Sequence, residues 1–202
     1  MIKVVAWDFD GVLNRSWAEG AETWARDLEA GTGASLQSYY EHVFADGFHR
    51  IIAGREDVLD RVSGWITKVG GRMPAEELLA WWFAKDARPD PETIELMETL
   101  TKRGTRQVIA TNNEARRTAF IRDQMGFGAR VEMIFASGHM GVMKPEPTYF
   151  AHIVDTLEVA PSDLLLIDDR EANVEAAVKA GWQAFHFTIE TRGQLATLLL
   201  SL

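Results

Sequence analysis

Short apolar segments recur along the chain and alternate with longer segments whose apolar residues follow a helical spacing. The strand-like segments cover residues 2–8, 107–111, 131–137, 164–168 and 182–187. The helix-like segments cover residues 91–103, 114–125, 147–157, 171–180 and 191–202. Strands that alternate with helices predict an α/β fold, in which right-handed crossovers build a doubly wound parallel sheet with helices on both faces. Ligands of such sheets bind at the carboxyl ends of the strands.

One long interval interrupts the alternation. About a hundred residues separate Asp8 from the next strand-like segment, far more than a single crossover needs. Residues 16–86 in this interval show helical patterns only, and Arg88-Pro89-Asp90-Pro91 has the composition of a return linker. We therefore expect an α/β core of residues 1–15 and 87–202, with an all-helical domain of residues 16–86 inserted after the first strand. An insertion rooted at the end of that strand can act as a lid.

The first strand ends in two acidic residues, in the sequence KVVAWDFDGVLN (residues 3–14). In an extended chain Asp8 and Asp10 face the same side, about 7 Å apart, and Gly11 then lets the backbone turn. Two carboxylates at this distance repel each other, and a divalent cation such as Mg²⁺ relieves the repulsion. Taken alone, the pair is equally typical of aspartates that end a strand and cap a turn.

Three later segments also carry polar residues at or near strand ends. Thr111 precedes a helix N-terminus, which favours phosphate binding, although Thr111 and Glu114 also fit a capping box. Lys144 lies in the loop GVMKPEP, where it can counter phosphate charge, although a single lysine is more often a solvated surface residue. Asp168 and Asp169 end the strand LLLID, so one of them can face a site, or one can cap the next helix.

Composition narrows the possible partners. The formal net charge is −9, because 30 Asp and Glu outnumber 21 Lys and Arg, and we expect no nucleic-acid partner. The absence of cysteine excludes a disulfide framework, thiolate metal ligands and a cysteine nucleophile. The N-terminal apolar run is interrupted at Asp8, and no segment approaches the roughly 18 apolar residues of a membrane span. We therefore expect a cytoplasmic protein with no membrane partner, either a monomer or a homodimer.

Taken in order, the four segments resemble the four motifs of the haloacid dehalogenase-like superfamily. These are DFDGVL, then TNN after a strand, then KP, and finally IDDREANVEAAVKAG. The resemblance implies a Rossmann-like core with a helical cap of the C1 type. It also favours the phosphatase branch, because the dehalogenases of this superfamily have no acid at the position of Asp10. A halide leaving group needs no proton, whereas an alkoxide does.

The resemblance also implies roles for individual residues. Asp8 would be the nucleophile, and Asp10 would first protonate the leaving oxygen and then activate water. Lys144 would neutralise charge in the transition state. Thr111 and the backbone N–H of Asn112 would bind the phosphoryl oxygens.

The same resemblance implies a Mg²⁺ site. The Asp8 carboxylate, the Asp10 backbone carbonyl and the Asp169 side chain would hold the ion, and Asp168 would act nearby. We therefore expect a Mg²⁺-dependent phosphatase that hydrolyses a small phosphorylated metabolite, such as a sugar phosphate, through an aspartyl-phosphate intermediate. A sugar phosphomutase would carry the same motifs. A phospho-receiver domain is a more distant alternative, since receivers are shorter and place their adjacent acids early.

Other residues are open to two interpretations. Trp17 follows the first motif closely and is expected near the site entrance. Three polar residues of the insertion, His49, Arg50 and Arg55, can reach a substrate or remain solvated. Arg170 is expected at the surface, and Asn14 is assigned no role. The remaining histidines are expected to be structural: His42, His139, His152 and His186.

Overall fold

The computed structural model describes residues 2–15, 17–18, 21–22, 24–33, 35–71 and 73–202. Side chains of residues 16–23 and of residue 26 are not part of that description. The side chain of Trp17, which is expected at the site entrance, therefore lies outside that description.

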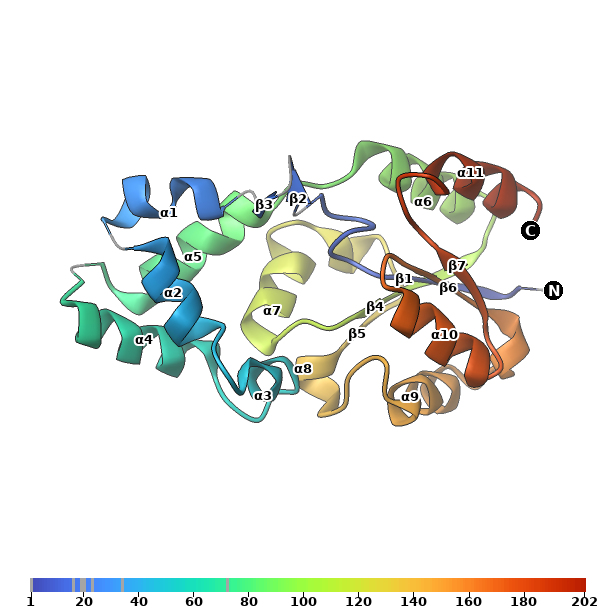
Figure 1. Cartoon of the computed structure of the whole chain (residues 1–202). Helices are drawn as coiled ribbons and strands as arrows, with labels where there is room; N and C mark the ends of the chain where they lie inside the picture. The colour runs from blue at the N-terminus through green and yellow to red at the C-terminus, as the bar shows by residue number, and fades with distance from the viewer. Residues whose placement is uncertain (1, 16, 19–20, 23, 34, 72) are drawn as a thin grey trace.

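A five-stranded parallel sheet forms the centre of the α/β part of the molecule, to one side of helices α1–α5 of residues 25–86 (Figure 1). Its strands are β1 (Val4–Trp7), β4 (Arg106–Thr111), β5 (Met133–Ala136), β6 (Leu164–Asp168) and β7 (Gln183–His186), in the spatial order β5-β4-β1-β6-β7. The predicted α/β class and doubly wound sheet are confirmed. The strand order reverses between β1 and β6, so these two strand ends flank the position where such sheets bind ligands.

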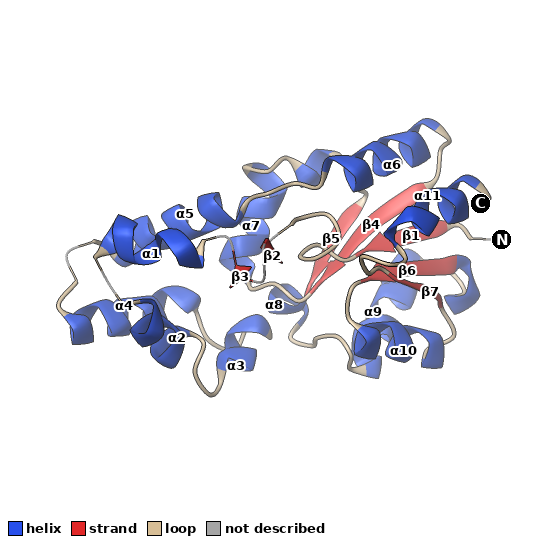
Figure 2. Cartoon of the chain, turned by 45° about the horizontal axis from the view of Figure 1, so that its top comes forward, coloured by secondary structure: helices blue, strands red, loops and turns tan. Residues whose placement is uncertain are grey.

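Helices cover both faces of this sheet (Figure 2). On one face α6 (Pro91–Lys102), α7 (Ala115–Asp123) and α11 (Arg192–Leu200) pack against Val5 and Trp7. On the other face α9 (Pro147–Leu157) and α10 (Glu171–Lys179) pack against Val4 and Ala6. Alternate residues of β1 thus point to opposite faces, and all four side chains are fully buried. Three short helical turns complete the core: η1 (Phe127–Ala129), α8 (Ser137–Met140) and η2 (Pro161–Asp163).

The insertion after β1 is mostly helical, and we call it the cap. It contains α1 (Ala25–Thr32), α2 (Leu36–Val43), α3 (Phe48–Ile52), α4 (Val58–Val69) and α5 (Ala75–Asp86). The expectation of helix from residue 17 onward is wrong, because β2 (Trp17–Ala18) pairs antiparallel with β3 (Ala21–Glu22).

The cap has a hydrophobic cluster of its own, separate from the two clusters that pack on the sheet. Aromatic rings dominate it: Tyr39 and Trp65 meet edge to face at 4.9 Å between centroids, and Trp24 and Trp82 lie 5.4 Å apart. Large rings supply the apolar area that so small a helical unit needs. The boundaries expected from the sequence, at residues 15/16 and 86/87, remain a prediction.

The two linkers between cap and core run side by side. The backbone N–H of Arg15 donates to Arg88 O at 2.8 Å, and that of Asp90 donates to Leu13 O at 2.9 Å. Asp90 also caps α6 by accepting from the backbone of Glu92, and it forms ion pairs with Arg15 and Arg192. The outgoing and returning chains are therefore joined by backbone and side-chain bonds together.

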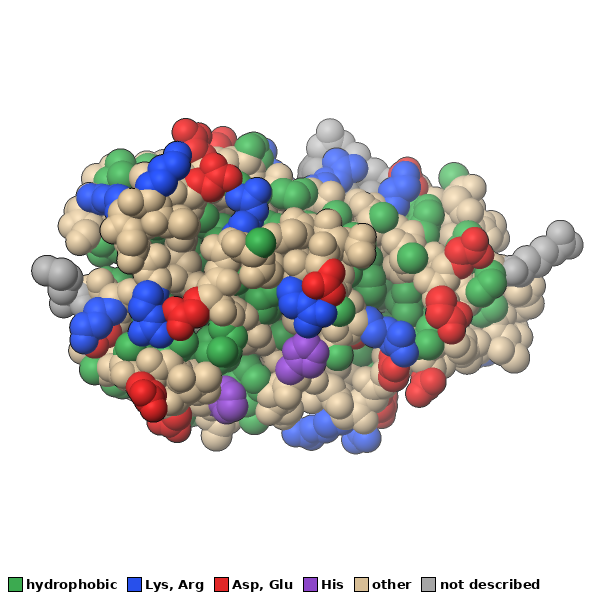
Figure 3. Space-filling model, turned by 180° about the vertical axis from the view of Figure 1, so that it is seen from behind, with side chains coloured by type: hydrophobic (Ala, Val, Ile, Leu, Met, Phe, Trp, Pro, Cys, Tyr) green, Lys and Arg blue, Asp and Glu red, His purple; other side chains and the backbone are tan. Residues whose placement is uncertain are grey.

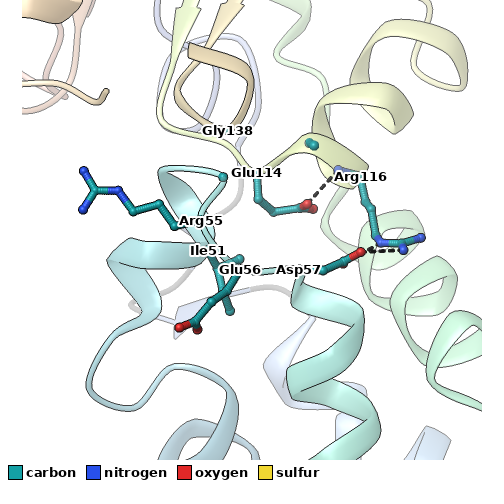
Figure 4. Close-up of a pocket in the computed structure, with 9 residues that line it drawn as sticks. Ile51, Arg55, Glu56, Asp57, Glu114, Arg116 and Gly138 are labelled. Carbon is teal, nitrogen blue, oxygen red and sulfur yellow. Dashed lines mark hydrogen bonds and ion pairs between the residues drawn. The ribbon is translucent and has the colours of Figure 1, made fainter. Parts of the chain in front are cut away.

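The cap touches the core at a second place, around the loop that follows α3 (Figure 4). Ser137 Oγ donates to Ile52 O at 2.7 Å, and a Cβ added to Gly54 would lie 2.1 Å from Gly138 O. The Arg116 guanidinium forms two bonds of 2.7 Å with the Asp57 carboxylate beside a cavity of about 250 Å³. The loop and the α8 backbone are thus so close that only glycine fits at position 54.

Acidic and basic side chains are interspersed over the face of the molecule shown in Figure 3. Several ion pairs among the described residues are exposed, such as Arg106–Glu132 at 2.8 Å and Arg130–Glu98 at 2.7 Å. Pairs of this kind contribute at most about 1 kcal/mol to stability. Among the described residues, no helix combines the length and apolar character that a membrane crossing requires.

Candidate active site

Asp8 follows β1 directly and faces a buried lysine. Lys144 Nζ lies 3.0 Å from Asp8 Oδ1 and 2.6 Å from Asp168 Oδ2, and it donates to Ala110 O at 2.6 Å. The lysine is only 1% exposed, so it is not the solvated surface residue that its type alone would favour. Burial would lower the pKa of Lys144, but the Asp8 and Asp168 carboxylates raise it above its ordinary value. The ammonium group is therefore charged.

Three acids from two strand ends converge beside this lysine. Asp8, Asp168 and Asp169 each offer one carboxylate oxygen within 4.8 Å of the others. Burial raises the pKa of Asp8 to about 8; Lys144 opposes the rise, and Asp168 and Asp169 add to it. One lysine thus does not compensate the whole negative charge.

The surroundings of Asp169 fit a cation. Its Oδ1 atom is buried and has no hydrogen-bond partner among the described residues. Burial, together with the charge of Asp168, raises its pKa. Gly11 leaves room for this carboxylate, since a Cβ there would lie 2.3 Å from Asp169 Oδ2. Carboxylate oxygens with unfilled bonding capacity are the ligands that Mg²⁺ prefers.

Asp168 is held by the helix that follows it. Asn173 Nδ2 lies 3.0 and 3.1 Å from its two carboxylate oxygens, and the backbone N–H of Arg170 donates to Oδ1 at 2.9 Å. The side chain is fully buried. With Lys144 on its other side, Asp168 is the most fixed of the three acids.

Asp10 points away from the other acids. Its Oδ1 accepts from Asn14 at 2.9 Å and from Arg117 at 2.8 Å, and its Oδ2 accepts from Asn113 at 3.0 Å. The expectation that an extended chain carries Asp8 and Asp10 to one point holds only in part, because β1 ends at Trp7 and the chain then turns. Burial would raise the pKa of Asp10, but Arg117 and the two asparagines hold it below its ordinary value.

The end of β4 supplies Thr111 and Asn112. Thr111 is buried, and its Oγ1 accepts from Asn113 Nδ2 at 2.8 Å. The Asn112 side chain binds the backbone of Lys144 twice, at 2.8 and 2.9 Å, and so holds the lysine loop in place. The alternative capping box is not formed: Glu114 is itself the N-cap of α7 and accepts from two backbone N–H groups.

These residues open on a cavity of about 330 Å³ between core and cap. From the core Asp8, Asp10, Thr111, Asn112 and Lys144 line it, and from the cap Phe48, His49 and Ile52. Arg170 is exposed to solvent, as expected, yet it also lines this cavity. Arg50 instead pairs with Glu56, and Arg55 lines the separate cavity of Figure 4.

Sequence reasoning missed the residues that hold Asp10. Asn14 was assigned no role, yet it is fully buried and joins Asp10 to the Asp86 carbonyl and the Arg88 N–H. Arg117 binds both Asp10 and the Asp86 carboxylate. A signal for Arg117 does exist, because it lies four residues before the buried Ile121 and so on the core-facing side of its helix.

The family model of haloacid dehalogenase-like hydrolases matches residues 2–181. The chain therefore belongs to this family of hydrolases. Among curated relatives, the sesquiterpene phosphatase astK of Aspergillus oryzae is 27% identical over 118 residues, which cover 57% of this chain and 60% of the relative. Phosphoglycolate phosphatase of Aquifex aeolicus is 26% identical over 187 residues, 89% of this chain and 82% of the relative.

A third match, to flavin mononucleotide hydrolase 1 of Arabidopsis thaliana, is 36% identical but covers 30% of this chain and 25% of the relative. The chain thus spans less than two thirds of some relatives that it matches. Among solved structures, a HAD family enzyme from Bacteroides thetaiotaomicron, in complex with magnesium and inorganic phosphate, superposes with a TM-score of 0.75. It is 17% identical, and the match covers 93% of this chain and 95% of the neighbour, which shows the shared fold.

Proposed function

We propose that this protein is a Mg²⁺-dependent phosphatase that hydrolyses a phosphomonoester of a small molecule through an aspartyl-phosphate on Asp8. One observation carries the proposal. The Asp8 carboxylate opens on the cavity, lies 3.0 Å from a buried ammonium group and shares a cluster of unbalanced negative charge with Asp168 and Asp169. A nucleophile, a fixed positive charge and a cation-binding set therefore meet at one point.

The comparisons support the same activity. Two of the relatives are named as phosphatases, and the Bacteroides neighbour was crystallised with magnesium and inorganic phosphate. The side chains of Asp8 and Asp169 and the backbone carbonyl of Asp10 would hold Mg²⁺, with Asp168 nearby. The bound ion would neutralise the negative charge of the phosphoryl group.

The first step forms a bond between an Asp8 carboxylate oxygen and phosphorus, while the bond from phosphorus to the leaving oxygen breaks. Asp10 gives its proton to that oxygen, so the leaving group departs as a neutral alcohol. Lys144, the Thr111 hydroxyl and the Asn112 backbone N–H stabilise the charge on the phosphoryl oxygens. In the second step water attacks the aspartyl-phosphate, Asp10 takes a proton from that water, and phosphate leaves a free Asp8.

The position of Asp10 suits the two steps unequally. Bound to Arg117, Asn14 and Asn113, it is a charged carboxylate that can accept a proton from water. The first step needs a protonated Asp10 and hence a side-chain position away from Arg117. The proposal therefore includes a rotation of Asp10 when the substrate binds.

Hydrolysis of p-nitrophenyl phosphate, with and without Mg²⁺, tests this function. The wild-type protein should release phosphate and nitrophenol in equal amounts only when Mg²⁺ is present. Asp8→Asn should lower kcat by roughly 10³-fold or more, because the amide is a poor nucleophile. Asp123→Asn, in an exposed pair with Arg122 on α7, is the matched control and should keep wild-type activity. Equal rates in the two variants, or a stable phosphoprotein without turnover, would contradict the proposal.

A further inference from the structure

A second cavity, of about 210 Å³, adjoins the cavity that contains Asp8. The two share Asp10, Phe48, Ile52, Asn112 and Arg170 in their linings. A molecule whose phosphate lies beside Asp8 and Lys144 therefore extends past Asp10 into the second space. The group that reaches this space is the leaving group, because Asp10 is the residue that would protonate it. This inference rests on the proposed phosphatase function.

Rings make up most of the cap wall of the second cavity, and we call this space the aromatic chamber. The rings are those of Trp24, Phe44, Phe48 and Trp82, and Ile52 and Asp86 also belong to the cap side of the lining. Phe44 lies 4.6 Å from Phe48 and 5.4 Å from Trp82, and it stacks on Trp24 at 5.8 Å. Trp24 and Trp82 are buried, and the two phenylalanines are half-buried. A wall of contiguous rings favours an apolar or aromatic ligand over a strongly hydrated one.

Several polar groups that line the chamber are already paired with one another; Arg170 also lines it and is exposed to solvent. Arg117 binds Asp10 and Asp86, and Asn113 Nδ2 donates to Asp10 and to Thr111. Both carboxylate oxygens of Glu114 accept from backbone N–H groups of α7. A sugar placed here would leave several hydroxyl groups without partners or would break these pairs, and both outcomes weaken binding.

We propose that the aromatic chamber binds the leaving group of the substrate, and that this group is an apolar alcohol, aromatic or branched. The chamber is smaller than the roughly 300–1,000 Å³ cavities of drug-sized ligands, which sets the leaving group at about one or two rings. Phe48, which lines both cavities, selects for the apolar body. The preferred substrate is accordingly not a sugar phosphate.

Steady-state kinetics with benzyl phosphate and glucose 6-phosphate test this assignment. The wild-type protein should show a kcat/KM for benzyl phosphate at least about 100-fold above that for glucose 6-phosphate. Phe48→Ser should lower kcat/KM for benzyl phosphate about 10- to 100-fold and that for glucose 6-phosphate by a much smaller factor, so the ratio of the two values should fall. Tyr40→Ser is the matched control: Tyr40 contacts Trp24 and Phe44, is not among the residues that line either cavity, and should leave both values unchanged. A wild-type preference for glucose 6-phosphate, or an equal loss with both substrates in Phe48→Ser, would overturn the chamber assignment as a whole.

A binding measurement separates this inference from the proposed function. Benzylphosphonate cannot be hydrolysed, so its binding can be measured by calorimetry. The wild-type protein should bind benzylphosphonate at least about tenfold more tightly than methylphosphonate, whereas Phe48→Ser should bind the two phosphonates equally tightly. Selective binding of benzylphosphonate without turnover of any ester would refute the phosphatase and retain the chamber. Turnover with no such selectivity would retain the phosphatase and refute the chamber.

Discussion

The core and the cap contribute different kinds of side chain to the same pair of cavities. The core supplies charged groups at strand ends, such as Asp8, Asp168 and Lys144, each at most 7% exposed and joined by contacts of 2.6–3.0 Å. The cap supplies mainly rings and one aliphatic side chain, from α3, from α5 and from the residues that flank α1 and α2. Under the proposed function this difference separates two tasks: the core arranges charge for one kind of reaction, and the cap selects the molecule on which it acts.

Replacing Lys144 by Met should have the largest effect, because it leaves Asp8 and Asp168 buried without their cation. We expect a loss of about 3–5 kcal/mol in the free energy of unfolding and a fall in kcat of roughly 10³-fold. Urea denaturation and phosphate release measure the two effects. Lys3→Met removes an exposed lysine from its pair with Asp163 and should cost less than about 1 kcal/mol. Similar losses in both variants would show that the buried Lys144 contributes no more to stability and activity than the exposed Lys3.

Substitutions of two neighbouring arginines of α7 allow a comparison of the two places where the cap meets the core. Arg117 is 7% exposed and binds Asp10 and Asp86, whereas Arg116 is 44% exposed and binds Asp57. Arg117→Met should cost about 3–5 kcal/mol, because the buried Asp86 loses the charge of Arg117, and it should lower kcat about 10- to 100-fold, because Asp10 loses the group that keeps it a charged base for the second step. Arg116→Met should cost less than about 1 kcal/mol. Equal losses of stability and activity in the two variants would show that the contacts of Arg117 matter no more for the reaction than the contact of Arg116 with Asp57.

Mg²⁺ should stabilise the core and leave the cap unchanged. At 100 times its dissociation constant the ion adds about 2.7 kcal/mol to the free energy of unfolding. Hydrogen exchange should show slower opening of amides in β1 and β6, with cap amides unaffected. Asp169→Asn should abolish the effect, while Asp163→Asn, at a surface pair with Lys3, should keep it. Equal protection of core and cap would contradict a site confined to the strand ends.

The smallest expected effect concerns pH and the linker residue Asp90. Burial would raise the pKa of Asp90, but hydrogen bonds and charge from Arg15 and Arg192 hold it below its ordinary value of 3.8. A group with a lowered folded pKa stabilises the protein above about pH 4, and this contribution is lost as pH falls through the folded pKa. Asp90→Asn should therefore be less stable than wild type at pH 7, by about 1–2 kcal/mol, and the difference should shrink below pH 4.

Denaturation at pH 7 and pH 3 measures this difference. Asp123→Asn gives the comparison, because the Arg122–Asp123 pair is exposed and should change stability little at either pH. A gap between Asp90→Asn and wild type that stays constant from pH 7 to pH 3 would rule out the ion pairs as its source.

The order of strands and helices was predictable because each element carries its own pattern. The alternation of β1 residues between two buried faces and the acids after β1 and β6 are local features of the chain. The partners of Asp10 were not predictable in the same way: Arg117 lies 107 residues away, and only the folded sheet and helix bring it near. The burial of Lys144 likewise depends on Asn112, which holds its loop from another strand end.

The pairing of the two linkers has a consequence for how this architecture can be varied. The outgoing chain passes Leu13 and the returning chain passes Asp90, and a backbone bond of 2.9 Å joins these two residues. A segment whose ends are adjacent can be exchanged as a cassette without displacing the strands that flank it. A foreign helical unit grafted between Arg15 and Asp86 would keep Asn14 and Asp86, and with them the bonds to Asp10 and Arg117, while bringing its own preference for the molecule to be processed.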